Sequence, residues 1–503
     1  MAIQERPRQP KKPLVLSNNL LFIIIGVLAV LLVVLIVLSV NIGNTPPADT
    51  QPSSEPTTTP TTAPTTAPTT APTTQPPAPT RPVTPSGGNY VNVGEGYIVE
   101  VVRTNVETFD GDTNDDYSHP TSNYLPEGTV DYCAREPVYG GKTAYVLMRS
   151  GHRTYMKKKI YPPVEYVPEV KQYEGTLPDH NELSVVSLQM QGNHTILTLD
   201  TLWKAPFYFE LAPQKYRYPN GKGDRDYAVT SVTATYIDIT FCYATSFSGQ
   251  VQIPAGHPLF KSAEVIQNES DCTLRLHLRK AGGFYGWHAY YNDQDQLCFQ
   301  FLNPAKATAA QNKYGVNLTG VRIMLDVGHG GMDGGAVGKD AAGIEWEEAD
   351  LNLSLALALK AELESTGATV IMNRTGDTKI DINARQDDLM DTAPDICVAI
   401  HQNSYTNANV SGFDAMYYTP FSQPLAEKIY SYTTQSGVYQ ETNRKWSVVY
   451  FMMRQSVCPV VLTENGYVSN LEDLAGMVNP EVVQAKAEAI AHGIADYFLT
   501  INK

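Results

Sequence analysis

The sequence is poor in cysteine and in basic residues, and each shortage excludes a class of protein. Six cysteines among 503 residues are far too few for a disulfide scaffold. Lys and Arg number 37 against 52 Asp and Glu, which gives a net charge of −15. Sequence-independent binding of nucleic acid needs clustered basic residues, so we expect no nucleic-acid partner. A chain of this length is too long for one core and predicts two or three folded units.

Charge is absent from residues 20–40, a run of 21 residues that is almost entirely apolar. As a helix rising ~1.5 Å per residue, it would span roughly 31 Å and cross the core of a bilayer. A cleaved signal peptide is the alternative, but its apolar region usually has about 7–15 residues. Four basic residues precede the run and none follows it before Arg81. The positive-inside rule therefore predicts a transmembrane helix, with residues 1–19 as a cytoplasmic tail and the rest of the chain outside.

Apolar residues are scarce in residues 41–89, which consist mostly of Pro, Thr, Ala, Ser and Gln. Such a segment has little to bury, so nothing offsets its ordering entropy and we expect disorder. Proline keeps the chain extended at ~3.1 Å per residue. We interpret this Pro/Thr-rich linker as a semi-rigid spacer that holds the following domains away from the membrane.

Residues 90–315 are predicted to form a mostly-β domain. Its candidate strands are rich in β-branched and aromatic residues and have turn residues nearby; they are 185–190, 195–199, 230–242, 273–278 and 297–302. The loop at 217–227 leaves open a division into two sub-units. The aromatic stretch Phe284–Tyr291 could stack on sugars, but ordinary cross-strand packing is the favoured interpretation.

The six cysteines divide into two groups. Four lie in the mostly-β domain and allow three disulfide pairings, among which the sequence does not choose; they are Cys133, Cys242, Cys272 and Cys298. Cys397 and Cys458 sit in apolar runs of the following domain, where we expect buried small hydrophobes.

Residues 316–503 alternate between strands and helices, which is the pattern of an α/β domain. The expected strands are 321–325, 369–372, 395–400, 414–418 and 460–463, and the expected helices are 347–365, 425–435 and 481–498. His329, His401 and Glu464 each follow an expected strand, while Glu347 and Glu348 open the first helix. Ligands in such folds bind beyond the carboxyl ends of the strands.

Two histidines and a carboxylate from separate elements are the ligand set of a catalytic Zn²⁺, and a further Glu nearby is the usual general base. The alternative is structural, because a single His at a strand end is often only hydrogen-bonded and a Glu at a helix start interacts with the helix dipole.

Five motifs, in order between residues 321 and 498, resemble the zinc-dependent N-acetylmuramoyl-L-alanine amidases. They are Leu325-Asp-Val-Gly-His-Gly-Gly-Met-Asp-Gly-Gly-Ala-Val-Gly338, Glu348-Ala-Asp-Leu-Asn-Leu353, Gly367-Ala-Thr-Val-Ile-Met-Asn-Arg374, Ala399-Ile-His-Gln-Asn403 and Leu462-Thr-Glu-Asn-Gly-Tyr-Val-Ser-Asn470. The resemblance implies a mixed-sheet α/β domain with His329, Glu348 and His401 as zinc ligands and Glu464 as the catalytic carboxylate. Glu345 and Glu347 are close rivals for the ligand, but the Glu-x-Asp-x-Asn-Leu spacing favours Glu348.

Other residues of these motifs receive weaker assignments. Arg374 and Arg385 are interpreted as structural members of ion pairs with Asp377 or Asp387. Asn403, or the amides of Gly330 and Gly331, could stabilise an oxyanion.

The resemblance implies hydrolysis of the amide between N-acetylmuramic acid and L-Ala of the stem peptide, with peptidoglycan as the partner outside the cell membrane. A zinc peptidase acting within the stem peptide and a non-catalytic wall-binding scaffold are the alternatives. Residues 228–303 weakly resemble the β-sandwich targeting domains found ahead of cell-wall amidases, so the mostly-β domain is a candidate wall-targeting unit.

The charge balance and one short connection bear on access to the site. Residues 316–503 contain 12 Lys and Arg against 24 Asp and Glu, so an anionic wall does not attract this domain and tethering must supply local concentration. Only 12 residues separate His401 from Asp414. Some related amidases cover the zinc with an inserted helix, and this connection predicts an open site instead.

Overall fold

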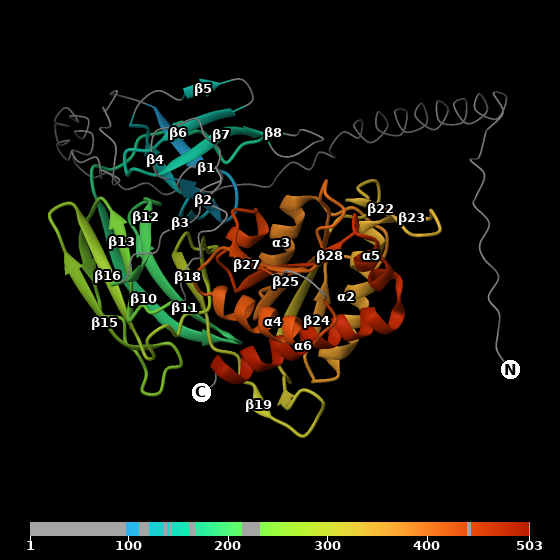
Figure 1. Ribbon diagram of the computed structural model, residues 1–503. Coiled ribbons are helices and arrows are strands. Elements are labelled where there is room, and N and C mark those ends of the chain that lie inside the picture. The colour runs from blue at the N-terminus through green and yellow to red at the C-terminus, as the bar shows by residue number, and fades with distance from the viewer. Residues whose placement is uncertain are drawn as a thin grey trace, which may run out of the picture. The chain divides into compact units, whose positions relative to one another are not determined.

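The computed structural model describes residues 97–109, 120–134, 138–140, 143–159, 166–213, 232–439 and 444–501. The expected cytoplasmic tail, transmembrane helix and Pro/Thr-rich linker lie outside these residues. Within the described ranges, no helix combines the length and apolar character needed to cross a membrane. From Tyr97 to Asn317 the described chain is β structure, and an α/β domain follows (Figure 1).

The first nine described strands form an N-terminal β part of two sheets. One sheet has the order β4-β1-β9, and the other has the order β3-β2-β7-β6-β5 with β8 beside β7. The strands are β1 (Ile98–Val101), β2 (Val106–Phe109), β3 (Pro120–Leu125), β4 (Val130–Tyr132), β5 (Val138–Gly140), β6 (Thr143–Leu147), β7 (Arg153–Lys159), β8 (Tyr166–Val167) and β9 (Val170–Gln172). Their shared core is small and rich in valine, as expected for β-branched residues in strands.

Residues 181–302 form a β-sandwich with sheet orders β14-β10-β11-β18-β17 and β12-β13-β16-β15. The strands are β10 (Asn181–Gln191), β11 (His194–Thr201), β12 (Phe207–Ala212), β13 (Tyr236–Cys242), β14 (Ala244–Ser248), β15 (Phe260–Gln267), β16 (Asp271–Leu278), β17 (Trp287–Tyr291) and β18 (Leu297–Leu302). Residues 217–227, where the sequence left open a division, lie outside the described residues, and the strands on either side of them, β12 and β13, pair directly with each other. The described β structure has its own sheets up to Gln172 and from Asn181 onward.

The aromatic stretch 284–291 packs inward, as the favoured interpretation held. Trp287 is buried and stacks on Phe209 with ring centroids 3.9 Å apart. Phe284 contacts Phe421 of the α/β domain, and the Trp287 amide donates to the Ser456 carbonyl at 2.7 Å. The sandwich and the α/β domain consequently share one hydrophobic core.

The cysteines form no disulfide in the structure. All six are buried free thiols, so none of the three possible pairings is made. Cys397 and Cys458 are fully buried in the shared core, which confirms the expectation that they behave as small hydrophobes.

A six-stranded mixed sheet with the order β24-β21-β25-β28-β26-β27 organises the C-terminal domain. β26 runs antiparallel to β28, and the other pairings are parallel. Its strands are β21 (Arg322–Val327), β24 (Thr369–Met372), β25 (Ile396–Asn403), β26 (Phe413–Tyr417), β27 (Arg444–Ser447) and β28 (Val460–Tyr467). Short pairs are made by β19 (Thr308–Ala309) with β20 (Val316–Asn317) and by β22 (Val337–Lys339) with β23 (Glu345–Glu347).

Helices cover both faces of this sheet (Figure 1). α2 (Glu348–Glu364), α4 (Gln423–Gln435) and α6 (Pro480–Ile501) pack on one face. α3 (Ile382–Thr392), the 3₁₀ helix η1 (Met452–Arg454) and the sandwich pack on the other, and α5 (Leu471–Val478) follows β28. The connection 404–412 contains turns and no helix, as its length predicted.

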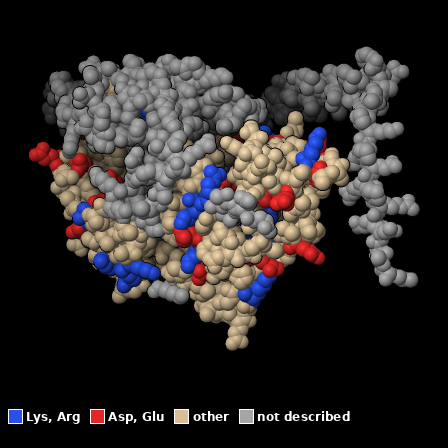
Figure 2. All heavy atoms as spheres, in the orientation of Figure 1, with Lys and Arg blue, Asp and Glu red and all other residues tan. Residues whose placement is uncertain are grey.

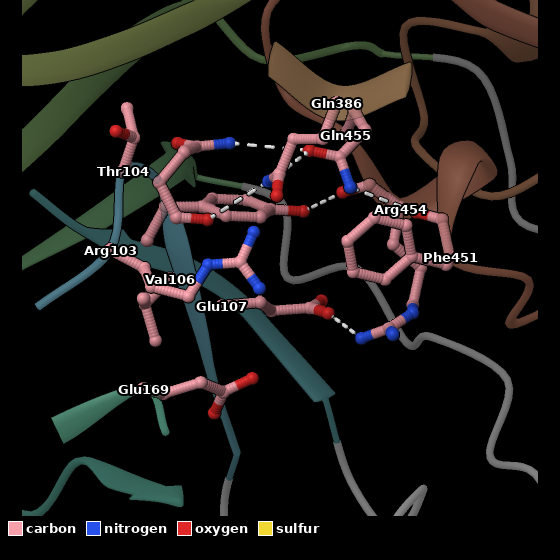
Figure 3. A pocket seen from close by; sticks show the side chains of 11 residues that line it. Arg103, Thr104, Val106, Glu107, Glu169, Gln386, Phe451, Arg454 and Gln455 are labelled. Carbon is pink, nitrogen blue, oxygen red and sulfur yellow. Dashed lines mark hydrogen bonds and ion pairs between the residues drawn. The ribbon is translucent and has the colours of Figure 1, made fainter. Parts of the chain in front are cut away.

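A small polar pocket lies where the N-terminal β part meets the C-terminal domain (Figure 3). Glu107 of β2 and Arg454 of η1 form an ion pair there, and both residues are buried. Tyr124 donates its hydroxyl to the Arg454 carbonyl, and Gln386 of α3 donates to Gln455 Oε1 at 2.9 Å. The contacts of Glu107 and Tyr124 with Arg454 fasten the N-terminal β part to the segment that leads into β28.

Arg454→Met is expected to destabilise the chain by roughly 3–5 kcal/mol, because it removes the Arg454 guanidinium from the buried Glu107 carboxylate. Urea unfolding followed by tryptophan fluorescence measures the loss. The double variant Glu107→Gln/Arg454→Met is the control and should recover most of the stability, since it buries no charge. Equal instability of the double variant would attribute the loss to packing rather than to the ion pair.

His152 is a buried histidine whose charge state couples stability to pH. Its Nε2 donates to the Phe207 carbonyl at 3.0 Å, which leaves Nδ1 to accept from the Ser150 hydroxyl at 2.8 Å. Burial lowers the pKa of His152 from 6.5 to about 3. Below pH 6.5 the unfolded chain binds the proton while the folded chain does not, so stability falls with decreasing pH down to about pH 3.

His152→Gln should be less stable than the wild type at pH 7.5, because it loses the buried imidazole. The difference in unfolding free energy between the two proteins should shrink by about 2 kcal/mol between about pH 6.5 and pH 4.5, because only the wild type is destabilised by protonation of His152 in the unfolded chain. Denaturant unfolding at a series of pH values measures this. His180→Gln is the control. His180 is exposed and Asp179 and Glu182 raise its pKa, so the difference in unfolding free energy between this variant and the wild type should not shrink as the pH falls. A gap that stays constant with pH would mean that His152 is not kept neutral in the folded chain.

Candidate metal centre

The glycine-rich loop after β21 carries His329 to the carboxyl edge of the sheet. His329 adopts a positive φ of 58°, and its Nδ1 lies 3.0 Å from Asp333 Oδ1. Two backbone hydrogen bonds between Gly330 and Asp333 close the loop. A Cβ on Gly328 would lie 2.3 Å from the His401 ring, so only glycine lets the two histidine-bearing segments approach this closely.

Glu348 is the first residue of α2 and is buried. Its carboxylate is held by donors from three segments: the Ala336 amide at 3.0 Å, the Gln402 amide at 3.2 Å and Asn352 Nδ2 at 3.3 Å. These donors fix the carboxylate before any further group binds. Such prior orientation is what a metal ligand requires.

Both histidines contact this carboxylate. His329 Nε2 lies 3.2 Å from Glu348 Oε2, and His401 Nδ1 lies 2.9 Å from Glu348 Oε1. Ligand atoms of the three residues all lie within 4.8 Å of one another. The structure therefore brings together the three side chains that the sequence proposed as zinc ligands, and their separations suit a shared ion.

The charges of the cluster support one another. Burial by itself would raise the pKa of Glu348, but hydrogen bonds and charge from His329 and His401 outweigh it and hold that pKa well below its usual range. Burial by itself would lower the pKa of His329, and its interactions with Glu348 and Asp333 outweigh it and raise the pKa. Positive charge at this position is thus favoured by the surrounding carboxylates.

Glu464 lies in β28 directly beside His401 of the neighbouring strand β25. The sequence placed both residues after their strands, but β25 and β28 continue through them. The Oε2 atom of Glu464 is buried and has no hydrogen-bond partner among the described residues. Burial, followed by the charges of Glu348 and Asp414, raises the pKa of Glu464 well above its usual value. Glu464 therefore holds a proton more readily than an ordinary glutamate, and it does so directly beside the candidate ligand His401.

The structure decides between Glu348 and the two other candidate carboxylate ligands. Glu345 and Glu347 are exposed on β23, and Glu345 pairs with Lys339 at 3.0 Å. Glu348 alone among these three carboxylates contacts the histidines.

The two arginines of the motifs are structural, but their partners differ from the expected ones. Arg385 pairs with Asp326 at 2.6 Å. Arg374 is buried and donates to the carbonyls of Gly328 at 2.8 Å and Ala349 at 2.7 Å, which adjoin His329 and Glu348. The Arg374 guanidinium therefore ties the His329 loop to the start of α2.

The glycine amides suggested as oxyanion donors are already engaged. Gly330 N–H donates to the Asp333 carbonyl at 2.8 Å, and Gly331 N–H donates to Asp377 Oδ1 at 2.6 Å. Asn403 stays a prediction for this role.

Sequence reasoning missed the residues that hold the ligands. Asp333 orients the second ring nitrogen of His329, and Asn352 bridges Glu348 and the Gly328 carbonyl. The only signals were spacings, since Asp333 and Asn352 stand four residues after His329 and Glu348.

Comparisons with known proteins point to one family. Residues 323–496 match the family described as N-acetylmuramoyl-L-alanine amidase. The sporulation-specific N-acetylmuramoyl-L-alanine amidase of Bacillus subtilis (strain 168) is 29% identical over 183 residues, which are 35% of this chain and 68% of that protein. The probable cell wall amidase LytH of Staphylococcus aureus is 31% identical over 183 residues, which are 36% of this chain and 60% of that protein.

A solved structure, the N-acetylmuramoyl-L-alanine amidase AmiC2 of Nostoc punctiforme, has 28% sequence identity and covers 36% of this chain and 97% of that one, with a TM-score of 0.33. The chain spans 60–68% of the length of the two curated relatives. The match falls on the domain that holds the cluster of His329, Glu348 and His401. The C-terminal domain of this chain is an N-acetylmuramoyl-L-alanine amidase domain.

Proposed function

We propose that the chain is a zinc-dependent peptidoglycan hydrolase that cleaves the amide between N-acetylmuramic acid and L-Ala of the stem peptide. The observation that carries the proposal is the convergence of His329, Glu348 and His401 within 4.8 Å, with Glu464 on the adjacent strand. Two imidazoles and one carboxylate are the donor set of a catalytic zinc site.

His329, Glu348 and His401 would hold the ion, and the Glu348 carboxylate, whose pKa is held low, supplies the negative charge that suits a dication. Zn²⁺ bound there supplies Lewis acidity toward the substrate carbonyl and toward water. Asp333 and Asn352 orient His329 and Glu348 from behind, so the donors need little rearrangement.

Glu464 moves the proton in this mechanism. Its carboxylate accepts a proton from the attacking water as the new C–O bond forms. The same carboxyl returns that proton to the L-Ala nitrogen as the C–N bond breaks. Burial and the neighbouring carboxylates favour its protonated form, which suits the second half of this cycle.

The remaining architecture would deliver this domain to its substrate. We propose that residues 20–40 anchor the chain in the cell membrane, that residues 41–89 act as the spacer, and that the amidase domain (316–503) faces the wall from outside. Residues of the sandwich share a hydrophobic core with β28, so one role of the middle region (90–315) is to support that strand. Wall targeting by the middle region stays a prediction. The helix-free connection 404–412 supports an open site that needs no partner to uncover it.

Product analysis on purified wall material tests the function. The full chain in detergent, loaded with zinc, should release intact stem peptides that begin with a free L-Ala amine, as read by mass spectrometry. A chelator should stop the release, and added zinc should restore it. Fragments cut within the stem peptide would establish the zinc peptidase instead. Binding to the wall without release would establish the scaffold, and release only after a partner is added would contradict the open site.

A further inference from the structure

Four ionisable side chains form one row across the carboxyl edge of the sheet. His401 of β25 pairs with Glu464 of β28, Glu464 with Asp414 of β26, and Asp414 with Arg444 of β27. Residues that pair directly across strands present their side chains on the same face. The residues two positions away on these strands pack in or against the core shared with the sandwich; they are Ala399, Leu462, Met416 and Trp446. The row therefore leads from the metal centre along one face to an arginine at the sheet edge.

Arg444 is held in place and still open to solvent. Its Nε and Nη2 donate to the two oxygens of Asp414 at 3.1 Å and 2.9 Å, and Nη2 also lies 3.3 Å from the Tyr467 hydroxyl. Its guanidinium carbon lies 5.2 Å from the centre of the Trp446 ring. The Arg444 side chain is 55% exposed although Asp414 is buried, and Nη1 has no acceptor among the described residues. Figure 2 shows basic side chains gathered over the part of the domain that Figure 1 labels β27.

We propose that Arg444 binds a carboxylate of the stem peptide and makes the enzyme select peptides that carry it; this rests on the proposed amidase function. The lactyl carboxyl of N-acetylmuramic acid is consumed in the scissile amide, and the acetamido groups of the glycan are neutral. Carboxylates are therefore found on the peptide side of the cleaved bond. Arginine suits their recognition because its donors lie in a fixed plane.

The spacing of the row fits this assignment. Strands lie about 4.8 Å apart, so Arg444 stands two strands, or roughly 10 Å, from Glu464. An extended peptide advances about 3.3–3.6 Å per residue. With the scissile amide at Glu464 and side chains bridging the remainder, a carboxylate on one of the first residues after L-Ala comes within reach of Nη1. The amidase domain is otherwise strongly acidic, so an exposed arginine at this position offsets its repulsion of an anionic peptide.

Steady-state kinetics on defined substrates tests the proposal. The substrates are disaccharide tetrapeptides in which one carboxylate at a time is replaced by a carboxamide. The wild-type full chain should lose roughly tenfold or more in kcat/KM at one such replacement, mainly through KM, as expected for a charge-assisted hydrogen bond. Arg444→Gln should bring the ratio between the carboxylate and carboxamide substrates to within about twofold, with zinc content unchanged.

Lys445→Gln is the matched control, because Lys445 is the adjacent cation and pairs with Glu427 instead; it should keep the wild-type ratio. If Arg444→Gln misfolds, the double variant Asp414→Asn/Arg444→Gln removes the buried charge as well and should show the same loss of selectivity. A wild-type enzyme indifferent to every replacement would overturn the proposal, and so would a variant that slows equally on all substrates. A wild-type chain that cleaves none of them would instead refute the amidase function itself.

Discussion

Glu464→Gln is expected to lower kcat by roughly 10²–10⁴-fold while leaving the bound zinc in place. The amide keeps the shape of the carboxyl group but neither accepts the water proton nor returns it to the leaving nitrogen. Glu464 is not among the three side chains that converge within 4.8 Å, so zinc content should stay at the wild-type stoichiometry. Stem-peptide release and metal analysis on the same preparation measure both quantities.

The stability of this variant gives an independent check. Because burial disfavours the charged form of Glu464, a neutral Gln should fold at least as stably as the wild type. Glu472→Gln is the matched control: Glu472 is exposed in the first turn of α5, shortly after β28, and its loss should leave kcat unchanged. Retained turnover in Glu464→Gln would assign the proton transfer to another group.

The sheet of the amidase domain was largely predictable, and its strand ends were not. The expected strands 395–400 and 460–463 ended at their last apolar or β-branched residues, but β25 continues to Asn403 and β28 to Tyr467. At the edge of a sheet, backbone pairing can continue where no core is left to bury, so polar residues such as His401 and Glu464 carry no hydrophobic signal for the strand. Their direct pairing, on which the row to Arg444 depends, therefore needed the structure.

Helix α3 shows a second limit. Its sequence has no apolar stripe, and Leu389 is its only fully buried apolar residue. Two polar residues, Arg385 and Gln386, are buried instead through contacts with Asp326 and Gln455. The only local signal was Asp381, whose side chain caps the helix by accepting from the Asn383 amide at 2.9 Å. Contacts with residues far apart in the sequence, rather than a local apolar pattern, therefore stabilise this helix.

The middle region shows why its arrangement could not be predicted even where its strands were. Val186 and Met190 alternate as a half-buried strand should, and β10 does contain them, but both side chains are exposed at 44% and 54%. A bulge between Val185 and Ser187 shifts the register of β10 against β11, and such a shift changes which face a residue occupies. The contact between Phe284 and Phe421 joins segments more than 130 residues apart, and no local pattern encodes that pairing.

His329→Ala should abolish zinc binding and turnover together, in contrast to Glu464→Gln. The substitution removes one of three donors and leaves Glu348 with only His401 as a histidine partner. Metal analysis should find little zinc after dialysis, and wall material should release no stem peptides. His180→Ala is the control, since His180 is exposed and its ring nitrogens contact Asp179 and Glu182, away from the cluster.

Thermal unfolding distinguishes loss of the metal from loss of the fold. A ligand that binds only the folded chain adds about 2.7 kcal/mol at a free concentration 100 times its Kd, so added zinc should raise the Tm of the wild type and of Glu464→Gln alike. In His329→Ala the same zinc should leave the Tm unchanged, although the domain still folds, because its core and the donors around Glu348 remain. A full zinc-dependent rise in that variant would mean that the ion binds elsewhere, and the three converging side chains would then be a hydrogen-bonded cluster without a metal.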